Sequence, residues 1–214
     1  MTELLLIRHG ETDWNVERRL QGHIDIDLNE KGRWQAQALG NALSNEALDA
    51  VYASDLQRAL LTAQAIASPQ RLTVQKERQL RERCYGVLEG MSYQEIKQAY
   101  PEIYITWRSR DIHARFPSGA SPAETLLEFS SRVVDRVIGI AQKHPKQKVA
   151  IVTHGGVLDC LYRAAAGKSL SVTRDFDILN AGINRLTWDG QSLAIAQWGD
   201  AAHLAEAALD ETDR

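Results

Sequence analysis

Residues 4–10 read Leu4-Leu5-Leu6-Ile7-Arg8-His9-Gly10, and this stretch decides the fold class. A short, uninterrupted apolar run is typical of a β-strand that is buried on both faces. Such strands belong to parallel sheets covered by helices, and ligands bind beyond the carboxyl ends of these strands. We therefore expect a buried strand that delivers Arg8 and His9 to a binding edge.

A second stretch repeats this arrangement near residue 150. Residues 149–153 form another apolar run, which ends in Thr153-His154-Gly155-Gly156. The sequence thus predicts two buried strands that each present a histidine at the tip. A further strand is expected over residues 49–53, just before Ser54-Asp55.

Helices are predicted between these strands. Residues 30–43 carry apolar residues at helical spacing, and so does the stretch from Leu56 to Ala67. A long helix is expected to begin at Ser121-Pro122-Ala123-Glu124, which combines a capping box with proline at the first helical position. Its inward residues would be Leu126, Phe129, Val133, Val137 and Ile140.

Near the C-terminus, Asp189-Gly190 between two short strands predicts a hairpin with a type I′ turn, and a short helix is expected from His203 onward. Together these elements predict an α/β fold, a three-layer α/β/α sandwich with a mostly parallel central sheet. We expect residues 1–214 to form a single domain, in which about 86–121 is an insertion over the site.

Composition restricts the classes of function. The chain has 214 residues, of which 44% are hydrophobic, and a net charge of −3 from 25 basic and 28 acidic residues. No basic excess points to nucleic acid, and the apolar run before Arg8 is too short for a signal peptide or a membrane span. The two cysteines, Cys84 and Cys160, form no C-x-x-C pattern, which fits a reducing compartment. We expect a cytoplasmic protein with neither nucleic-acid nor membrane partners.

The polar residues at the predicted strand ends fit phosphoryl transfer. This reaction needs a nucleophile in line with the leaving oxygen, positive donors around the other phosphoryl oxygens, and an acid for the leaving group. The chain offers histidines His9 and His154, arginines Arg8 and Arg58, and the carboxyl group of Glu82. An imidazole is a competent nucleophile only when one nitrogen is unprotonated, and neighbouring arginines favour that neutral form.

The residues also follow a known family pattern. The motifs are Arg8-His9-Gly10-Glu11-Thr12, Trp14-Asn15, Gln21-Gly22, Asp27-Leu28, Gly32 with Gln35-Ala36, Ser54-Asp55-Leu56-Gln57-Arg58-Ala59 with Thr62-Ala63, Leu80-Arg81-Glu82 with Tyr85-Gly86 and Glu89-Gly90, and Thr153-His154-Gly155-Gly156. In this order they resemble the histidine phosphatase superfamily, phosphoglycerate mutase-like branch. The resemblance covers about residues 3–160 and, more loosely, the rest of the chain.

The resemblance implies a role for each matching residue. His9 would attack phosphorus and form a phosphohistidine, Glu82 would donate the proton, and the phosphoryl oxygens would be held by Arg8, Arg58 and His154. Asn15, Gln21 and Gly155 would line the substrate pocket. The implied reaction needs no metal and no cofactor, and the implied partner is a small-molecule phosphomonoester. A homodimer is compatible with this pattern.

Simpler interpretations exist for single residues. A lone histidine at a strand end is more often structural, Arg58 could belong to a helix surface, and Glu82 could be a solvated charge, so only the joint pattern supports catalysis. The segment His23-Ile24-Asp25-Ile26-Asp27 alternates three candidate metal ligands, yet all lie on one short segment, and we interpret it as a solvated loop.

Two net reactions remain open, because a phosphohistidine can pass its phosphoryl group to water or back to a phosphoglycerate. Mutases of the family carry a lysine, an Arg-Arg pair after a tryptophan, and an asparagine after the second His-Gly. Here the matching positions are Tyr93, the interrupted Trp107-Arg108-Ser109-Arg110, and Gly156. We therefore favour a metal-independent phosphatase, with a cofactor-dependent phosphoglycerate mutase as the alternative and a non-catalytic phospho-ligand binding module as a third hypothesis.

Overall fold

The computed structural model describes residues 1–204, and its centre is a six-stranded sheet. The strands are β1 (Thr2–Arg8), β2 (Ala50–Ala53), β3 (Val74–Lys76), β4 (Lys148–Thr153), β5 (Ile183–Trp188) and β6 (Leu193–Asp200). They lie in the order β3-β2-β4-β1-β5-β6. The first four in this order are mutually parallel, β5 runs antiparallel to β1, and β6 antiparallel to β5. The predicted α/β class with a mostly parallel sheet is confirmed.

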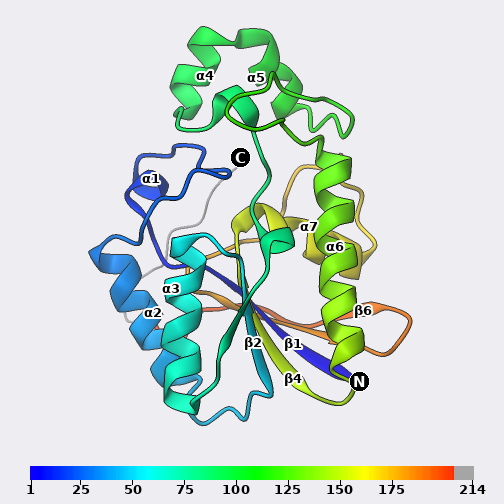
Figure 1. Ribbon diagram of the computed structural model, residues 1–214. Coiled ribbons are helices and arrows are strands. Elements are labelled where there is room, and N and C mark those ends of the chain that lie inside the picture. The colour runs from blue at the N-terminus through cyan, green and yellow to red at the C-terminus, as the bar shows by residue number, and fades with distance from the viewer. Residues whose placement is uncertain (205–214) are drawn as a thin grey trace.

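Helices cover both faces of the sheet (Figure 1). The pair α2 (Glu30–Ala42) and α3 (Gln57–Ala67) packs on one face, and α6 (Leu126–Lys143) and α7 (Gly155–Ala166) pack on the other. Side chains alternate along a strand, so β1 places Leu4 and Leu6 in one core and Leu5 and Ile7 in the other. Burial on both faces explains why the apolar run is continuous.

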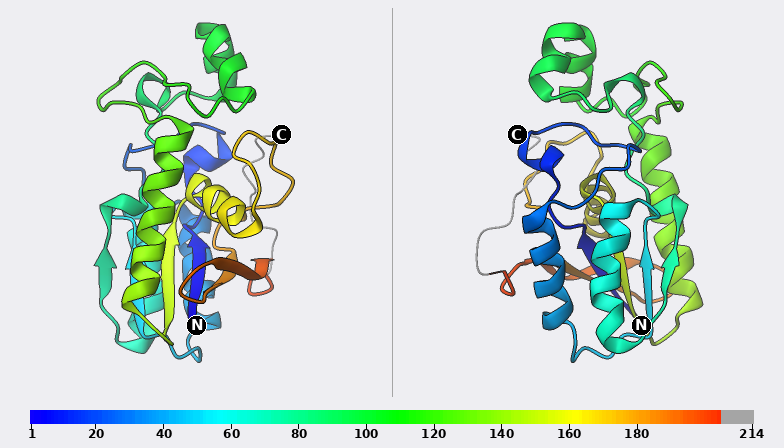
Figure 2. Two further views of the ribbon diagram at one scale, coloured as in Figure 1. Left: turned by 90° about the vertical axis from the view of Figure 1, so that its right-hand side faces the viewer. Right: turned by 60° about the vertical axis from the view of Figure 1, so that its left-hand side comes forward.

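The remaining helices lie beyond the carboxyl ends of the parallel strands. They are α1 (Asp13–Val16), α4 (Tyr93–Ala99) and α5 (Pro101–Arg108), with two short 3-10 helices at Arg78–Leu80 and Gly86–Leu88. A third 3-10 helix, Ser68–Gln70, lies at the opposite edge of the sheet, where Gln70 Oε1 accepts from the N–H of Leu48. Figure 2 shows α4 and α5 standing clear of the sheet in both views. This segment has a small core of its own, built from Leu20, Leu88, Ile96, Phe116 and Ala123.

The start of α6 differs from the sequence-based expectation. The N-cap is Thr125, whose hydroxyl accepts from the backbone N–H of Glu128 while the Glu128 carboxylate accepts from the N–H of Thr125. The predicted start at Ser121 is wrong because the Glu124 carboxylate binds Arg132 and the backbone N–H of Cys84 instead of closing a capping box. The predicted inward residues of this helix are all buried.

The β5–β6 hairpin is present, but its turn differs from the predicted type I′. A type I′ turn needs a positive φ at both central residues, and here Gly190 has it (φ +108°) while Asp189 does not. The Asp189 carboxylate closes a longer loop by accepting from the backbone N–H groups of Gln191 and Ser192. The helix predicted beyond His203 falls on residues 205–214, outside the described residues. Within residues 1–204, no helix has the length and apolarity to cross a bilayer.

Candidate active site

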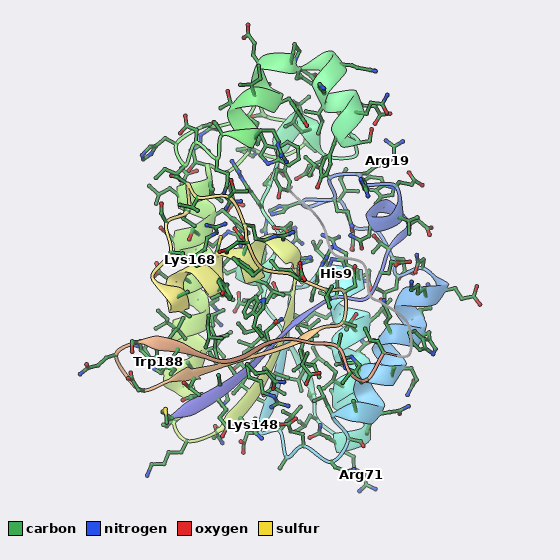
Figure 3. The ribbon with its side chains drawn as sticks, turned by 180° about the vertical axis from the view of Figure 1, so that it is seen from behind. His9, Arg19, Arg71, Lys148, Lys168 and Trp188 are labelled. Atoms are coloured by element: carbon green, nitrogen blue, oxygen red, sulfur yellow. The ribbon has the colours of Figure 1, made fainter. Side chains whose placement is uncertain are left out.

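Two histidines meet at the carboxyl edge of the sheet. Strands β1 and β4 are neighbours in register, with Arg8 opposite Thr153, so the residues that follow them lie side by side. The backbone N–H of His9 donates to the Thr153 carbonyl at 2.9 Å, and the rings of His9 and His154 are 5.2 Å apart between centroids. Figure 3 shows His9 at this edge, with Arg19 between it and the segment that holds α4 and α5.

Two buried arginines flank the histidines. Arg58, in the first turn of α3, donates from Nε to Nδ1 of His154 at 3.3 Å and from its two Nη atoms to the carbonyls of Gly22 and Ile24. Arg8 donates from Nη1 to the carbonyl of Ile178 at 2.8 Å. Because backbone carbonyls orient both side chains, the positive charges are fixed before any ligand arrives.

The hydrogen bonds assign opposite protonation patterns to the two rings. Nδ1 of His9 lies 2.7 Å from the Gly10 carbonyl, which can only accept, so Nδ1 carries the hydrogen and Nε2 carries the lone pair. An arginine can only donate, so Nδ1 of His154 is the acceptor and its Nε2 carries the hydrogen. This Nε2 is buried and has no partner among the described residues. One ring therefore offers a nucleophilic nitrogen and the other a hydrogen-bond donor.

Both imidazoles are kept neutral. Burial, and then the charges of Arg58 and Arg8, hold the pKa of His9 well below its ordinary value. Burial and Arg58 have the same effect on the pKa of His154. A neutral His9 retains the lone pair that an attack on phosphorus requires.

Glu82 is held by backbone groups. Its Oε1 accepts from the N–H of Arg83 at 2.7 Å, and its Oε2 accepts from the N–H of Gly156 at 2.8 Å. Gly156 lies in the first turn of α7, and a Cβ atom added there would stand 2.2 Å from Glu82 Oε1. The close approach of this carboxylate therefore requires glycine at position 156.

Six of the eight predicted site residues line one cavity of about 20 Å³: His9, Gln21, Arg58, Glu82, His154 and Gly155. The other two lie elsewhere. Arg8 precedes His9 and is fully buried. Asn15 closes the capping box of α1, whose N-cap is Thr12; its Oδ1 accepts from the backbone N–H and the hydroxyl of Thr12.

Several residues at the site carried no clear sequence signal of their own. Asn180, fully buried before β5, donates from Nδ2 to the His9 carbonyl at 3.0 Å. Thr62 accepts from the N–H of Gly10 and donates to the Arg58 carbonyl. Tyr85 and Tyr93 line the cavity. Thr62 and Tyr85 stood in the family motifs without a stated role, and Tyr93 stood only as the position where mutases carry a lysine, whereas nothing around Asn180 indicated its position.

The candidate metal ligands of the His23 segment are separated by other contacts. Nε2 of His23 lies 3.0 Å from the Glu82 carbonyl oxygen, Asp25 accepts from the N–H of Gln57, and Asp27 pairs with Arg33. Within residues 1–204, no three His, Cys, Asp or Glu side chains group as a metal site requires.

Comparison with known proteins agrees with this geometry. The family model described as histidine phosphatase superfamily (branch 1) matches residues 4–201. Among curated relatives, phosphoglycerate mutase-like protein 4 of Arabidopsis thaliana is 40% identical over 95% of this chain and 87% of its own length. The metal-independent phosphoserine phosphatase of the same plant is 37% identical over 96% of this chain and 84% of its own.

Solved structures share the fold. YhfR of Bacillus stearothermophilus superimposes with a TM-score of 0.86 at 34% identity, covering 95% of this chain and 99% of its own. The phosphoserine phosphatase of Entamoeba histolytica, in complex with 3-phosphoglyceric acid, superimposes with a TM-score of 0.84 at 25% identity over 95% of this chain and 100% of its own. Similar proteins thus bind small phosphorylated ligands.

Proposed function

Since this chain belongs to the histidine phosphatase superfamily (branch 1), we propose that it hydrolyses a small phosphomonoester without a metal ion, through a phosphohistidine on His9. The main support is that the imidazole rings of His9 and His154 line one cavity in complementary hydrogen-bonding states. Nε2 of His9 bears a lone pair and Nε2 of His154 bears a hydrogen, because Gly10 and Arg58 dictate the two hydrogen-bonding patterns.

In the first half-reaction, Nε2 of His9 attacks phosphorus as the bond from phosphorus to the ester oxygen breaks. Glu82, as a carboxylic acid, gives its proton to the leaving oxygen and releases the alcohol. A phosphate dianion beside the carboxyl group favours this protonated form. Arg8, Arg58 and the Nε2–H of His154 stabilise the phosphoryl oxygens.

In the second half-reaction, a water molecule attacks the phosphohistidine. Glu82, now a carboxylate, accepts a proton from that water as the oxygen–phosphorus bond forms and the nitrogen–phosphorus bond breaks. Inorganic phosphate leaves, and His9 and Glu82 return to their starting states. Gln21 and Gly155 contact the bound phosphoryl group from the cavity wall, and Asn15 supports the wall from behind.

We assign the choice of substrate to residues 86–121, acting as a cap on a single domain. Tyr93 and Trp107 from this segment line a second cavity beside the phosphoryl cavity. Phosphoserine is the first substrate to test, since relatives at 37% and 34% identity are named phosphoserine phosphatases.

The mutase alternative is supported by the names of several relatives, including the probable phosphoglycerate mutase GpmB of Proteus mirabilis at 30% identity. Gly156 argues against it. The asparagine that mutases carry at this position would place its Cβ 2.2 Å from Glu82 Oε1. Arg110, one of the two arginines after Trp107, is also engaged by Asp159 at 2.7 Å.

The proposal is tested with purified protein in excess EDTA. We expect hydrolysis of p-nitrophenyl phosphate and acid-labile labelling of His9, and at least about a 10⁴-fold loss of kcat in His9→Ala. The exposed His113→Ala is the matched control and should retain both. Activity that disappears with EDTA and returns with a divalent metal would contradict the proposal.

A coupled assay separates the alternatives. Interconversion of 2- and 3-phosphoglycerate, stimulated by the bisphosphorylated primer and faster than hydrolysis, would establish the mutase. Binding of phosphorylated ligands without labelling of His9 would establish the binding module.

A further inference from the structure

The loop that carries Glu82 is held by one arginine of α6. Arg132 donates from Nη1 to the carbonyls of Gln79 and Arg81, at 2.7 and 3.1 Å, and from Nη2 to the carbonyl of Glu82 at 3.2 Å. A single side chain thus binds three backbone carbonyls within residues 79–82. These contacts attach the loop to a helix that lies 50 to 53 positions further along the chain.

The guanidinium of Arg132 is fully engaged. Its Nε and Nη2 also donate to the two carboxylate oxygens of Glu124, at 2.6 and 2.7 Å. A guanidinium has five N–H groups, and the three carbonyls and two carboxylate oxygens account for all five. The group also lies over the buried ring of Phe129, 5.2 Å from its centroid. Contacts at its edge and on its face therefore fix the guanidinium in one position.

Glu124 binds the same loop from its other oxygen. Its Oε2 also accepts from the backbone N–H of Cys84 at 3.0 Å. Burial raises the pKa of Glu124, but the hydrogen bonds from Arg132 and Cys84 outweigh burial and lower the pKa, so the carboxylate stays charged. Because this carboxylate serves the loop, it does not cap α6, which begins after Thr125. Local helix signals are commonly overridden in this way near functional sites.

The position of the loop decides where the Glu82 carboxyl group lies. Its Oε1 is bound by the N–H of Arg83, within the loop, and its Oε2 by the N–H of Gly156, in α7. Both bonds form together only while the loop keeps its distance from α7. Since α6 and α7 pack in the same core, an arginine of α6 that holds the loop also sets this distance. A displacement of about 1 Å in a catalytic group can cost about 100-fold in rate.

We propose that Arg132, paired with Glu124, is a positioning residue for proton transfer: it holds the Glu82 carboxyl group at the leaving oxygen without touching the substrate. Arg132 is not among the residues that line the two cavities. This inference rests on the proposed function, in which Glu82 is the proton donor. A purely structural role for Arg132 would instead predict the same loss of activity on every substrate.

The test compares two substrates of similar size that differ in their need for an acid. Benzyl phosphate releases an alkoxide, which needs a proton, whereas p-nitrophenyl phosphate releases a stable phenolate. The quantity measured is kcat/KM, which reports phosphoryl transfer to His9 whichever later step limits turnover. In Arg132→Met we expect kcat/KM to fall about 10- to 100-fold for benzyl phosphate and at most about threefold for p-nitrophenyl phosphate.

Arg136→Met is the matched control. Arg136 lies one turn further along α6 and pairs with Glu77, which precedes the loop. The side chains of Arg132 and Arg136 are 21% and 22% exposed, so each variant removes a comparable ion pair. Arg136→Met should lose a similar amount of stability toward urea, yet keep kcat/KM for both substrates within about threefold of the unmodified protein.

A double variant tests whether Arg132 acts through Glu82. In Glu82→Gln no proton can be donated, so the exact position of the side chain no longer matters for the leaving group. Adding Arg132→Met to Glu82→Gln should therefore lower kcat/KM for benzyl phosphate by no more than about threefold.

The outcomes are distinguishable. Equal losses on the two substrates in Arg132→Met, an undiminished rate on benzyl phosphate, or additive losses in the double variant would overturn the positioning role and leave the phosphatase proposal standing. Failure of the unmodified protein to hydrolyse either substrate would overturn the proposed function itself.

If Arg132→Met does not fold, Arg132→Lys decides. Lysine keeps the charge, but its single nitrogen cannot reach all five acceptors. A selective loss on benzyl phosphate in Arg132→Lys supports the positioning role, and kinetics equal to those of the unmodified protein on both substrates overturn it.

Discussion

The carboxyl edge of the sheet, which holds the two histidines, and residues 86–121, which lie beyond it, differ in how their side chains are held. At the edge, Arg8, Arg58 and His154 are at most 1% exposed, and backbone carbonyls or one another hold their side chains. In residues 86–121, α5 has no buried residue, and Trp107 makes T-shaped contacts with three tyrosine rings. The edge thus suits catalysis, which requires side chains in fixed positions. The less buried segment suits substrate selection, because its residues can be substituted with little effect on stability.

This comparison predicts that substitutions at the edge lower kcat. Glu82→Gln has the largest expected effect, a loss of about 10²- to 10⁴-fold for alkyl phosphates, because the leaving alkoxide needs a proton. Nitrophenolate leaves without one, so p-nitrophenyl phosphate should lose at most about tenfold. Steady-state kinetics on both substrates measure the difference. Equal losses on the two would rule out Glu82 as the proton donor.

Gly156→Asn should have the next largest effect, since its Cβ would displace the Glu82 carboxylate. We expect kcat to fall by about 10- to 100-fold with no gain of phosphoglycerate interconversion. Gly139→Ala in α6 is the control, because a Cβ there meets nothing within 4 Å. It should keep full activity and gain about 0.5–1 kcal/mol in unfolding free energy. Full activity in Gly156→Asn would show that the carboxylate can move without cost.

The buried histidines predict a pH dependence of stability. Folding lowers the pKa of both His9 and His154, whereas unfolded histidines titrate near pH 6.5. The unfolded chain therefore binds more protons below that pH, so stability is complete above about pH 6.5 and is lost as the pH falls toward the folded-state pKa values. Each histidine should contribute up to about 1.4 kcal/mol per pH unit.

Urea unfolding at pH 7 and pH 5 measures this loss, and the double variant His9→Asn/His154→Asn should show a flatter dependence. An unchanged dependence in the double variant would mean that other groups are responsible, with His23 and His203 as the next candidates because burial also lowers their pKa.

The segment above the edge should show the smallest effect and a different kind. Trp107→Ala removes the centre of the tyrosine cluster and part of the second cavity wall. We expect KM for phosphoserine to rise about 3- to 10-fold, by more than kcat falls. Tyr162→Ala, in an aromatic cluster with Phe176 and Trp198 outside both cavities, is a matched loss of aromatic packing. A larger effect on kcat than on KM in Trp107→Ala would contradict the division between the two regions.

The sequence alone determined the class of fold and much of the candidate site. Apolar runs that stop at His9 and at His154 predict buried strands with histidines at their ends, because a strand that is buried on both faces is apolar at every consecutive position. Local signals also located the inward face of α6, although its start was misplaced by competition for the Glu124 carboxylate.

Only the tertiary structure decided how distant parts of the chain meet. The contact of Arg58 with His154 spans 96 positions, and that of Asn180 with His9 spans 171. The hydrogen-bonding pattern of His154 and the requirement for glycine at 156 both depend on such contacts. No periodicity in the sequence encodes them, because burial and electrostatic environment are properties of the folded surroundings and not of neighbouring residues.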